Sequence, residues 1–210
     1  MVEYTFEEIK KYLPQYLCDE SINDLFKEIN CFQNSGYNNN LYTNQLYDKT
    51  LIFQGDVLNE MQFIFFPAPK VFKTLGMVLS NTCDINIENS HFSDIQICYA
   101  PIFKLQNYID GLHDKFTDQQ IEDHIKCIKN QRYTTIMYLP SHLNGPTEDA
   151  IVLLDKICNC DSSSIERTKL TNRRFFTLNN FGLYLYLLKI SIHFTRIRES
   201  IDRDKGLILN

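Results

Sequence analysis

The chain has 210 residues, of which 44% are hydrophobic and 22% are charged, a composition typical of a globular protein that excludes disorder over any long stretch. The formal net charge of -5 excludes a general electrostatic attraction to nucleic acid, so nucleic-acid binding would need a local basic face. The longest apolar run, residues 181–188, ends at Lys189 and is far shorter than the roughly 20 residues of a membrane span, so no membrane association is expected.

Residues 1–48 are predicted to form an amino-terminal helical segment. Thr5 with Glu8 has the form of a capping box, and Ser21 with Asp24 begins a second helix. The second helix carries one apolar face, made by Ile22, Leu25, Phe26, Ile29 and Phe32. That face can pack on the body of the protein or on a partner, and packing on the body is the favoured interpretation.

The pattern changes to strands from residue 51 onward. Apolar runs bounded by turn residues predict strands at residues 51–53, 57–66, 77–79, 95–99, 133–139, 150–157, 165–168 and 174–176. Pro67 and Pro69 interrupt the ladder after the second strand, which predicts a long, basic and exposed connection that includes residues 71–73. Pro101 is predicted to close the strand at residues 95–99.

Helices are expected as an insertion and at the end of the chain. Residues 102–132 are predicted to be a helical insertion, in which Thr117 and Gln120 cap a helix whose apolar face carries Ile121, Ile125 and Ile128. Asn179 or Asn180 is predicted to cap a closing helix at residues 179–203. Its apolar residues follow two lines, Phe181, Leu185, Leu188 and Ile192 on one and Leu183, Leu187, Ile190 and Phe194 on the other. Because the two lines cover well over half of its circumference, the helix should be deeply buried and the second line should need a second cover.

A polar turn follows the strand at residues 77–79 and is the first candidate site. Ser80, Asn81, Thr82, Cys83 and Asp84 are short polar or polarisable side chains in succession, a pattern typical of a tight loop that hydrogen-bonds nearby backbone. Cys83 beside Asp84, with His91 downstream, could be a nucleophile with an acid and a base. The favoured alternative is structural: Asn81 and Asp84 cap turns while Cys83 packs as a small apolar residue.

Cysteines, histidines and basic residues supply the other candidates. Seven cysteines, an odd number with no secretory signal before them, predict a reducing cytoplasm. Cys158 and Cys160 lack the spacing of common zinc sites, and His124 with Cys127 makes only two ligands, so neither a metal nor a cofactor is expected. Positive charge interleaved with Phe175 and Phe176 could form an RNA-binding face from Arg167, Lys169, Arg173, Arg174, Lys189, Arg196 and Arg198. Acidic neighbours, Glu166, Glu199, Asp202 and Asp204, favour a solvated surface of mixed charge instead.

The order of four short motifs resembles the MazF/PemK-like toxin family. The matching positions are Gly55-Asp56, residues 74–80 (TLGMVLS), Ala100-Pro101 and Asp155-Lys156-Ile157. The resemblance covers residues 50–101 and 150–195 and leaves the amino-terminal helices and the helical insertion outside it. It implies a small, strongly bent β-barrel, often dimeric, and in many members cleavage of single-stranded RNA by an Arg on the second strand and a Ser or Thr after the third.

Both catalytic positions implied by the resemblance depart from the family pattern. Thr74 stands in place of the Arg, Leu75 in place of its Pro, and Phe103 in place of the hydroxyl residue. Loss of the Arg removes a cation expected to stabilise developing phosphate charge. Lys73 could supply a charge, although alternation along a strand aims it at the other face.

The expected fold class is α+β: a small, strongly bent β-barrel over residues 49–210 with the helical insertion, preceded by the helical segment at residues 1–48 and closed by the long helix. The resemblance implies a cytoplasmic bacterial toxin-antitoxin or defence protein. The favoured function is protein binding or regulation, through an antitoxin-like protein, a transcription factor or a homodimer. The expected binding residues are Lys70, Lys73, Ser80, Asn81, Cys83 and Asp84. The alternative is a metal-independent, sequence-specific endoribonuclease with relocated catalytic groups among Lys73, Thr74, Cys83 and Asp84.

Overall fold

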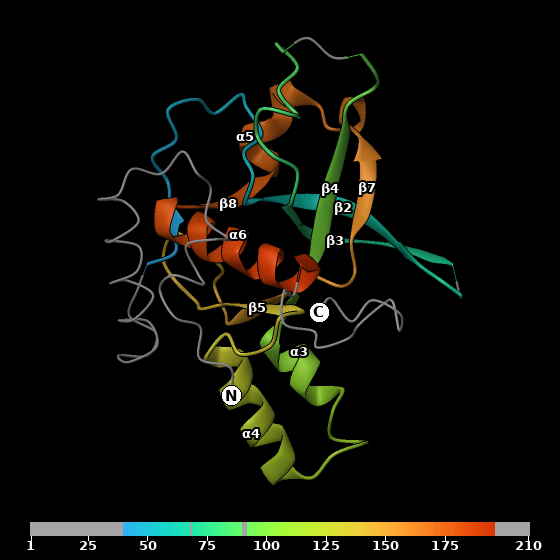
Figure 1. The fold of residues 1–210 in the computed structure, drawn as a ribbon, viewed down its shortest axis with the longest axis vertical. Coiled ribbons are helices and arrows are strands. Elements are labelled where there is room, and N and C mark those ends of the chain that lie inside the picture. The colour runs from blue at the N-terminus through green and yellow to red at the C-terminus, as the bar shows by residue number, and fades with distance from the viewer. Residues whose placement is uncertain (1–39, 68, 90–91, 196–210) are drawn as a thin grey trace, which may run out of the picture.

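The computed structural model describes residues 40–67, 69–89 and 92–195 (Figure 1). The strands are β1 (Tyr42–Thr43), β2 (Asp56–Phe65), β3 (Lys70–Val78), β4 (Gln96–Lys104), β5 (Ile136–Leu139), β6 (Ala150–Leu153), β7 (Cys158–Asp161) and β8 (Arg174–Leu178). The α-helices are α3 (Leu105–Asp110), α4 (Asp118–Lys129), α5 (Leu170–Arg173) and α6 (Asn180–Thr195). Two short 3-10 helices, η1 (Ser162–Ser164) and η2 (Arg167–Lys169), lie between β7 and α5.

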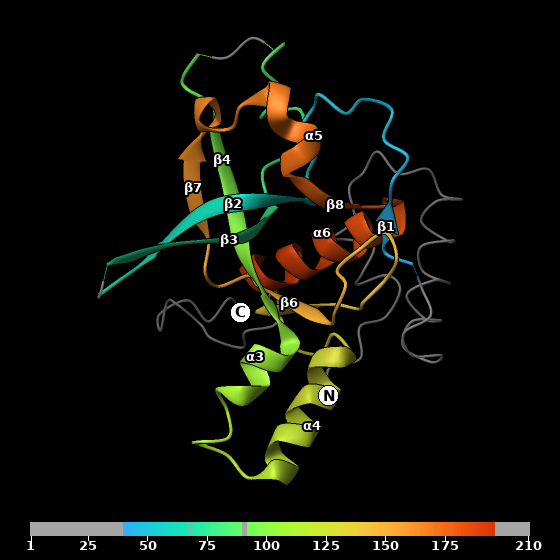
Figure 2. The same cartoon turned by 180° about the vertical axis from the view of Figure 1, so that it is seen from behind.

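The strands form one antiparallel sheet in the order β1-β8-β2-β3-β4-β6-β5, with β7 paired to β4. The predicted α+β class is confirmed, but the predicted closed barrel is wrong because the end strands β1 and β5 do not pair with each other. The amino-terminal half of β4 pairs with β3 and β7, whereas its carboxy-terminal half pairs with β6. The sheet bends at this divided strand, and α6 packs across it (Figures 1 and 2).

The helix α6 is deeply buried, as its composition predicts. Phe181, Leu185 and Leu188 join the largest core cluster with residues from the strands, and Leu183 and Ile190 of the second apolar line also pack against this cluster. Asn179 caps the helix by accepting a hydrogen bond from the Gly182 backbone N–H at 2.8 Å. The helix passes close to the chain before β1 at Gly182, which has no Cβ. A Cβ at this position would lie 2.3 Å from the Leu41 carbonyl oxygen, so a larger residue would not fit. The sheet core therefore covers much of both apolar lines.

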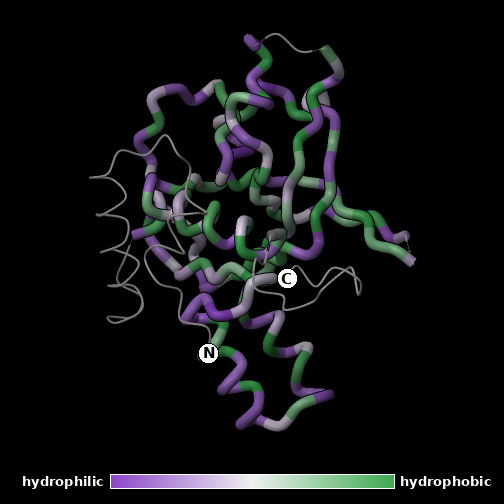
Figure 3. The backbone as a smooth tube through the Cα atoms, in the orientation of Figure 1, coloured by the Kyte–Doolittle hydropathy of each residue, from purple (hydrophilic) through white to green (hydrophobic). Residues whose placement is uncertain are grey.

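The segment between β2 and β3 differs most from the sequence prediction. The predicted strand at residues 57–66 is confirmed as β2, but residues 71–73 belong to β3 and are not an exposed loop. Cross-strand pairs join Phe63 to Phe72 and Ile64 to Val71, so the two strands continue almost to the prolines that join them. Residues 51–53, predicted to be a strand, are not one. Figure 3 shows that the resulting hairpin is mainly hydrophobic and projects beyond the rest of the sheet.

The helical insertion begins later than predicted. Residues 102–104 still belong to β4, and Pro101 lies inside that strand opposite Gly76. The capping box of Thr117 and Gln120 is confirmed at the start of α4. Ile121 and Ile128 are buried, and the α3–α4 pair lies at one end of the molecule (Figures 1 and 2).

The remaining strand predictions are partly confirmed. Strands predicted at residues 133–139, 150–157 and 174–176 correspond to β5, β6 and β8, whereas residues 165–168 contain part of η2 and no strand. The strands β1 and β7 were not predicted, because each is short and lacks an apolar run. The predicted helices before residue 40 and the predicted continuation of α6 past residue 195 lie outside the described residues. Within the described part of the chain, no helix combines the length and apolar character needed to cross a membrane.

Candidate functional site

The polar turn at residues 80–84 is held by hydrogen bonds to the backbone around it. Ser80 Oγ accepts a bond from the Cys98 backbone N–H at 2.8 Å, which continues the β3–β4 pairing beyond the end of β3. Thr82 Oγ1 accepts from the Gln54 N–H at 3.0 Å, and Asn81 Oδ1 accepts from the Cys83 N–H at 2.9 Å. The prediction that these side chains hydrogen-bond local backbone is confirmed. Their polar atoms stabilise the turn.

Cys83 is exposed in this turn, so the prediction that it packs as a small apolar residue is wrong. The backbone N–H of Asp84 donates to the Asn81 carbonyl at 3.1 Å, which closes the turn. His91, the proposed base, lies outside the described residues. The turn therefore presents a thiol beside a carboxylate with no described histidine.

A buried ion pair fixes the Gly55-Asp56 motif at the start of β2. Asp56 is completely buried, and its Oδ2 lies 2.9 Å from both Nε and Nη2 of Arg174 on β8. The Phe53 backbone N–H also donates to this oxygen at 2.9 Å. Burial raises the pKa of Asp56, while the Arg174 guanidinium opposes that change. The guanidinium also donates to the carbonyls of Lys49 and Leu51, so Arg174 holds the segment before β2 in place.

Thr74 and Phe103, which occupy the positions of the family's catalytic residues, take part in packing. Thr74 Oγ1 donates to the Ile102 carbonyl at 3.3 Å, and the Phe103 ring lies 6.5 Å from the Phe72 ring between centroids. Lys73 pairs with Gln62 and Thr74 pairs with Met61, so the two neighbouring side chains point to opposite faces of β3. Lys73 therefore does not replace the missing Arg at Thr74.

The structure places the expected binding residues in two separate regions. Lys70 and Lys73 are exposed near the tip of the β2–β3 hairpin, whereas Ser80, Asn81, Cys83 and Asp84 lie past the other end of β3. Lys73 and Ser80 are seven positions apart, which along an extended strand corresponds to about 23 Å. The six residues cannot contact one small ligand together.

The basic residues of the last third are bound individually within the protein. Arg173 donates to the Asn59 carbonyl at 3.0 Å, Arg174 pairs with Asp56, and Lys169 lies 2.7 Å from Glu166. The expected Arg196 and Arg198 lie outside the described residues. Each of these three basic residues, Arg173, Arg174 and Lys169, therefore has a partner within the protein.

Lys189 is buried, whereas the sequence pattern predicted that it lies on the charged surface. It is 5% exposed, and its Nζ donates to the carbonyls of Gln131, at 3.1 Å, and Tyr133. Burial lowers the pKa of Lys189 to about 7. A signal was present in the sequence, because Leu185 and Ile192 flank this lysine at helical spacing on an apolar line. The lysine ties α6 to the segment between α4 and β5.

His124 lies between two tyrosines. Its Nε2 is 2.9 Å from the Tyr108 hydroxyl, and its Nδ1 is 2.7 Å from the Tyr133 hydroxyl. Burial lowers the pKa of His124. Among the described residues, His, Cys, Asp and Glu side chains nowhere gather in a group of three that could hold a metal ion.

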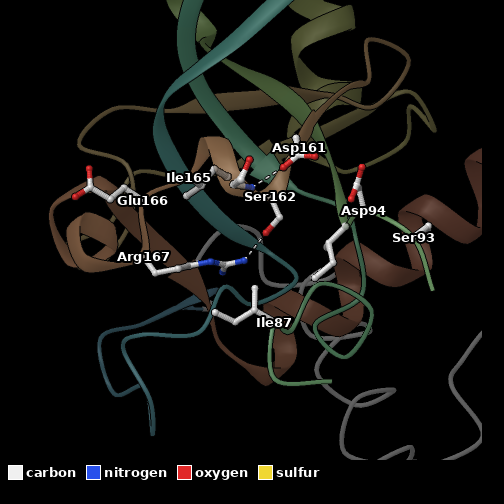
Figure 4. Close-up of a pocket in the computed structure, with 10 residues that line it drawn as sticks. Ile87, Ser93, Asp94, Asp161, Ser162, Ile165, Glu166 and Arg167 are labelled. Atoms are coloured by element: carbon white, nitrogen blue, oxygen red, sulfur yellow. Dashed lines mark hydrogen bonds between the residues drawn. The ribbon is translucent and has the colours of Figure 1, made fainter. Parts of the chain in front are cut away.

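A cavity of about 530 Å³ lies beside η1 and η2 (Figure 4). Its lining comprises Ile87, Ser93, Asp94, Ile95, Asp161, Ser162, Ser163, Ile165, Glu166 and Arg167. Arg167 donates to Ser162 Oγ at 2.7 Å, and burial lowers the pKa of Arg167. Asp161 accepts from the Ser163 N–H, and Glu166 accepts from Thr168. Of the residues singled out in the sequence, Arg167 of the candidate RNA-binding face lines this cavity, whereas Lys70, Lys73, Thr74 and the turn at residues 80–84 do not.

Comparison with known proteins does not add an assignment. No protein-family model matches the sequence, and no curated protein matches it significantly.

Proposed function

We propose that this protein acts by binding a protein partner, as a MazF-like component of a bacterial toxin-antitoxin or defence system, and does not cut RNA. The observation that carries the proposal is the packing of Thr74 and Phe103. At the positions where the resemblance calls for a cation and a hydroxyl, one side chain bonds the Ile102 carbonyl and the other packs on an aromatic ring.

The surrounding charges support the same proposal. Lys73 points to the opposite face from Thr74. Arg173 and Arg174, two basic residues near β2, are bonded to the Asn59 carbonyl and to Asp56. A transition state with developing phosphate charge needs preorganised donors, which typically contribute several kcal/mol. Among the residues that the structure describes, the side chains next to Thr74 do not supply such donors.

The second candidate function, a metal-independent endoribonuclease with relocated groups, has one observation in its favour. Cys83 is exposed beside Asp84 in a turn that hydrogen bonds hold in place. A nucleophilic thiol needs a base to activate it, and an RNA-cutting site also needs a cation near the phosphate. Lys73, at about 23 Å along the strand, is too distant from this turn to serve it.

Incubation with mixed-sequence single-stranded RNA in the presence of a chelator tests the proposal. The intact protein should leave the RNA uncut. Sequence-specific cuts that disappear in Lys73→Ala or Cys83→Ser, but persist in Lys115→Ala, would overturn the proposal and establish the second candidate. Lys115 is an exposed lysine between α3 and α4 and so serves as the matched control.

A further inference from the structure

The hairpin formed by residues 61–75 of β2 and β3, named the arm here, extends away from the rest of the sheet in two opposite views (Figures 1 and 2). β3 pairs with β2 along most of its length, but it pairs with β4 only from Gly76 to Val78. Thr74 Oγ1 still bonds the Ile102 carbonyl of β4, but within the described residues the edge of β3 at residues 70–73 is paired with no strand. An unpaired edge presents backbone N–H and C=O groups that can bond an added strand.

One face of the arm exposes apolar side chains beside the polar pair of Gln62 and Lys73. Ile64 and Val71 lie directly opposite each other, with 40% and 60% of their surfaces exposed, and Phe66 next to the turn is 79% exposed. The other face is different, because Phe63, Phe65 and Phe72 pack on one another and on Tyr99 of β4. The exposed apolar group at the end of a projecting hairpin is typical of an interaction surface.

The charge of the arm identifies the kind of partner. Residues 61–75 contain Lys70 and Lys73 and no acidic residue, although the whole chain has a net charge of -5. Lys156 adds a third cation, with its Nζ 5.2 Å from the centroid of the Phe65 ring. If two copies paired through this edge, their lysines would be brought together, and like charges in neighbouring strands are destabilising. The arm is complementary to an acidic strand instead.

We propose that the edge of β3 at residues 70–73 binds an extended acidic segment of a partner protein by adding it to the sheet as a strand. This inference rests on the proposed protein-binding function and names the surface and the partner chemistry. Lys70 and Lys73 are three positions apart, so they lie on opposite faces, and two acidic residues at the same spacing can pair with both. The two residues between the acidic ones lie opposite Val71 and Phe72 and are apolar.

A short peptide containing Glu-Val-Val-Glu is the matched probe, because this pattern is the same in both chain directions and so fits a parallel or an antiparallel addition. The peptide, blocked at both ends and labelled with fluorescein, is titrated with the full chain while anisotropy is recorded. Binding should weaken at least tenfold in the double variant Lys70→Glu/Lys73→Glu. It should be unchanged in Lys115→Glu/Lys126→Glu, which makes the same charge change at two exposed lysines outside the arm.

Two further peptides separate strand addition from charge attraction. Methylation of the backbone nitrogens of both valines removes two donors without changing the charge, and this peptide should bind at least tenfold more weakly. A Lys-Val-Val-Lys peptide should not bind. Shifts of the backbone amide NMR signals of Val71, Phe72 and Lys73 when the peptide is added to the wild-type protein would confirm the binding position without relying on a variant.

The proposal is overturned if the Glu-Val-Val-Glu peptide does not bind, if its methylated form binds equally well, or if the arm variant keeps full affinity. It is also overturned if single-stranded RNA or vesicles of anionic lipid compete for the same lysines more strongly than the peptide does. Failure of peptide binding in a protein that leaves RNA intact removes this inference alone. RNA cuts that require Lys73 remove the proposed function itself.

Discussion

The two ends of β3 differ in how their side chains are used. At the carboxy-terminal end, Ser80 and Thr82 direct their polar atoms to backbone groups of neighbouring segments. At the amino-terminal end, Val71 is exposed, the lysines have no acidic residue beside them within the arm, and no described strand pairs with the edge at residues 70–73. Polar residues thus hold the structure at one end, and apolar and basic residues are presented at the other. A cluster of polar residues in a sequence is therefore not by itself a functional site.

The largest expected loss of stability comes from the ion pair that anchors the structured end. Arg174→Ala leaves the carboxylate of Asp56 buried without its partner, which typically costs about 3 to 5 kcal/mol. Chemical denaturation should show this loss. The exposed Arg132→Ala is the matched control and should change the free energy of unfolding by less than about 0.5 kcal/mol. Equal stability of the two variants would mean that the pair does not anchor the start of β2.

The next effect concerns Lys189 and depends on pH. An unfolded lysine has a pKa of about 10.4, whereas burial lowers the pKa of Lys189 to about 7. At pH values between these two pKa values, Lys189 binds a proton more fully in the unfolded chain than in the folded chain. The free energy of unfolding should therefore rise by a few kcal/mol from pH 7 to pH 10. Below pH 7 the lysine is protonated in both states, and its contribution is constant.

The difference in the free energy of unfolding between the wild-type protein and Lys189→Met, followed against pH, isolates the titration of Lys189 from those of other groups. The variant should lack the part of the rise that Lys189 causes, whereas the exposed Lys115→Met should keep it. Parallel stability curves for the wild-type protein and Lys189→Met over this pH range would show that Lys189 titrates normally.

Smaller effects distinguish the two ends of β3 directly. Ser80→Ala removes the acceptor of the Cys98 N–H and should cost about 1 to 2 kcal/mol. Val71→Ser, on the exposed face of the arm, should change stability by less than about 0.5 kcal/mol. Thermal unfolding of both variants measures the difference. A larger loss for Val71→Ser than for Ser80→Ala would reverse the roles given to the two ends.

Local patterns in the sequence predicted the elements that local interactions define. The capping box of Thr117 and Gln120, the apolar run of β2 and the all-round apolar surface of α6 were found in this way. Part of the candidate site was also predicted, because Asn81 bonds the backbone of its own turn as the composition indicates, whereas the distant partners of Ser80 and Thr82 were not predicted.

Features that depend on distant residues were not predicted. Residues 71–73 of the arm were expected to be an exposed loop because Pro67 and Pro69 precede them, yet pairing between Phe63 and Phe72 includes them in β3. The pair of Asp56 with Arg174 joins residues 118 positions apart, and β7 exists because it pairs with β4. The prediction of a barrel was wrong for the same reason, because closure of the sheet depends on whether β1 pairs with β5. Side-chain pattern alone does not contain these pairings.

Amide hydrogen exchange, with and without the Glu-Val-Val-Glu peptide, tests the division of β3 most directly. In the free protein, alternate amides at residues 70–73 should exchange rapidly, because they face an unpaired edge, while those of Gln54 and Cys98 should be protected by Thr82 and Ser80. Saturating peptide should slow exchange in the arm and leave Gln54 and Cys98 unchanged. Slower exchange at Gln54 and Cys98, with no change at residues 70–73, would contradict the account and place binding at the polar turn.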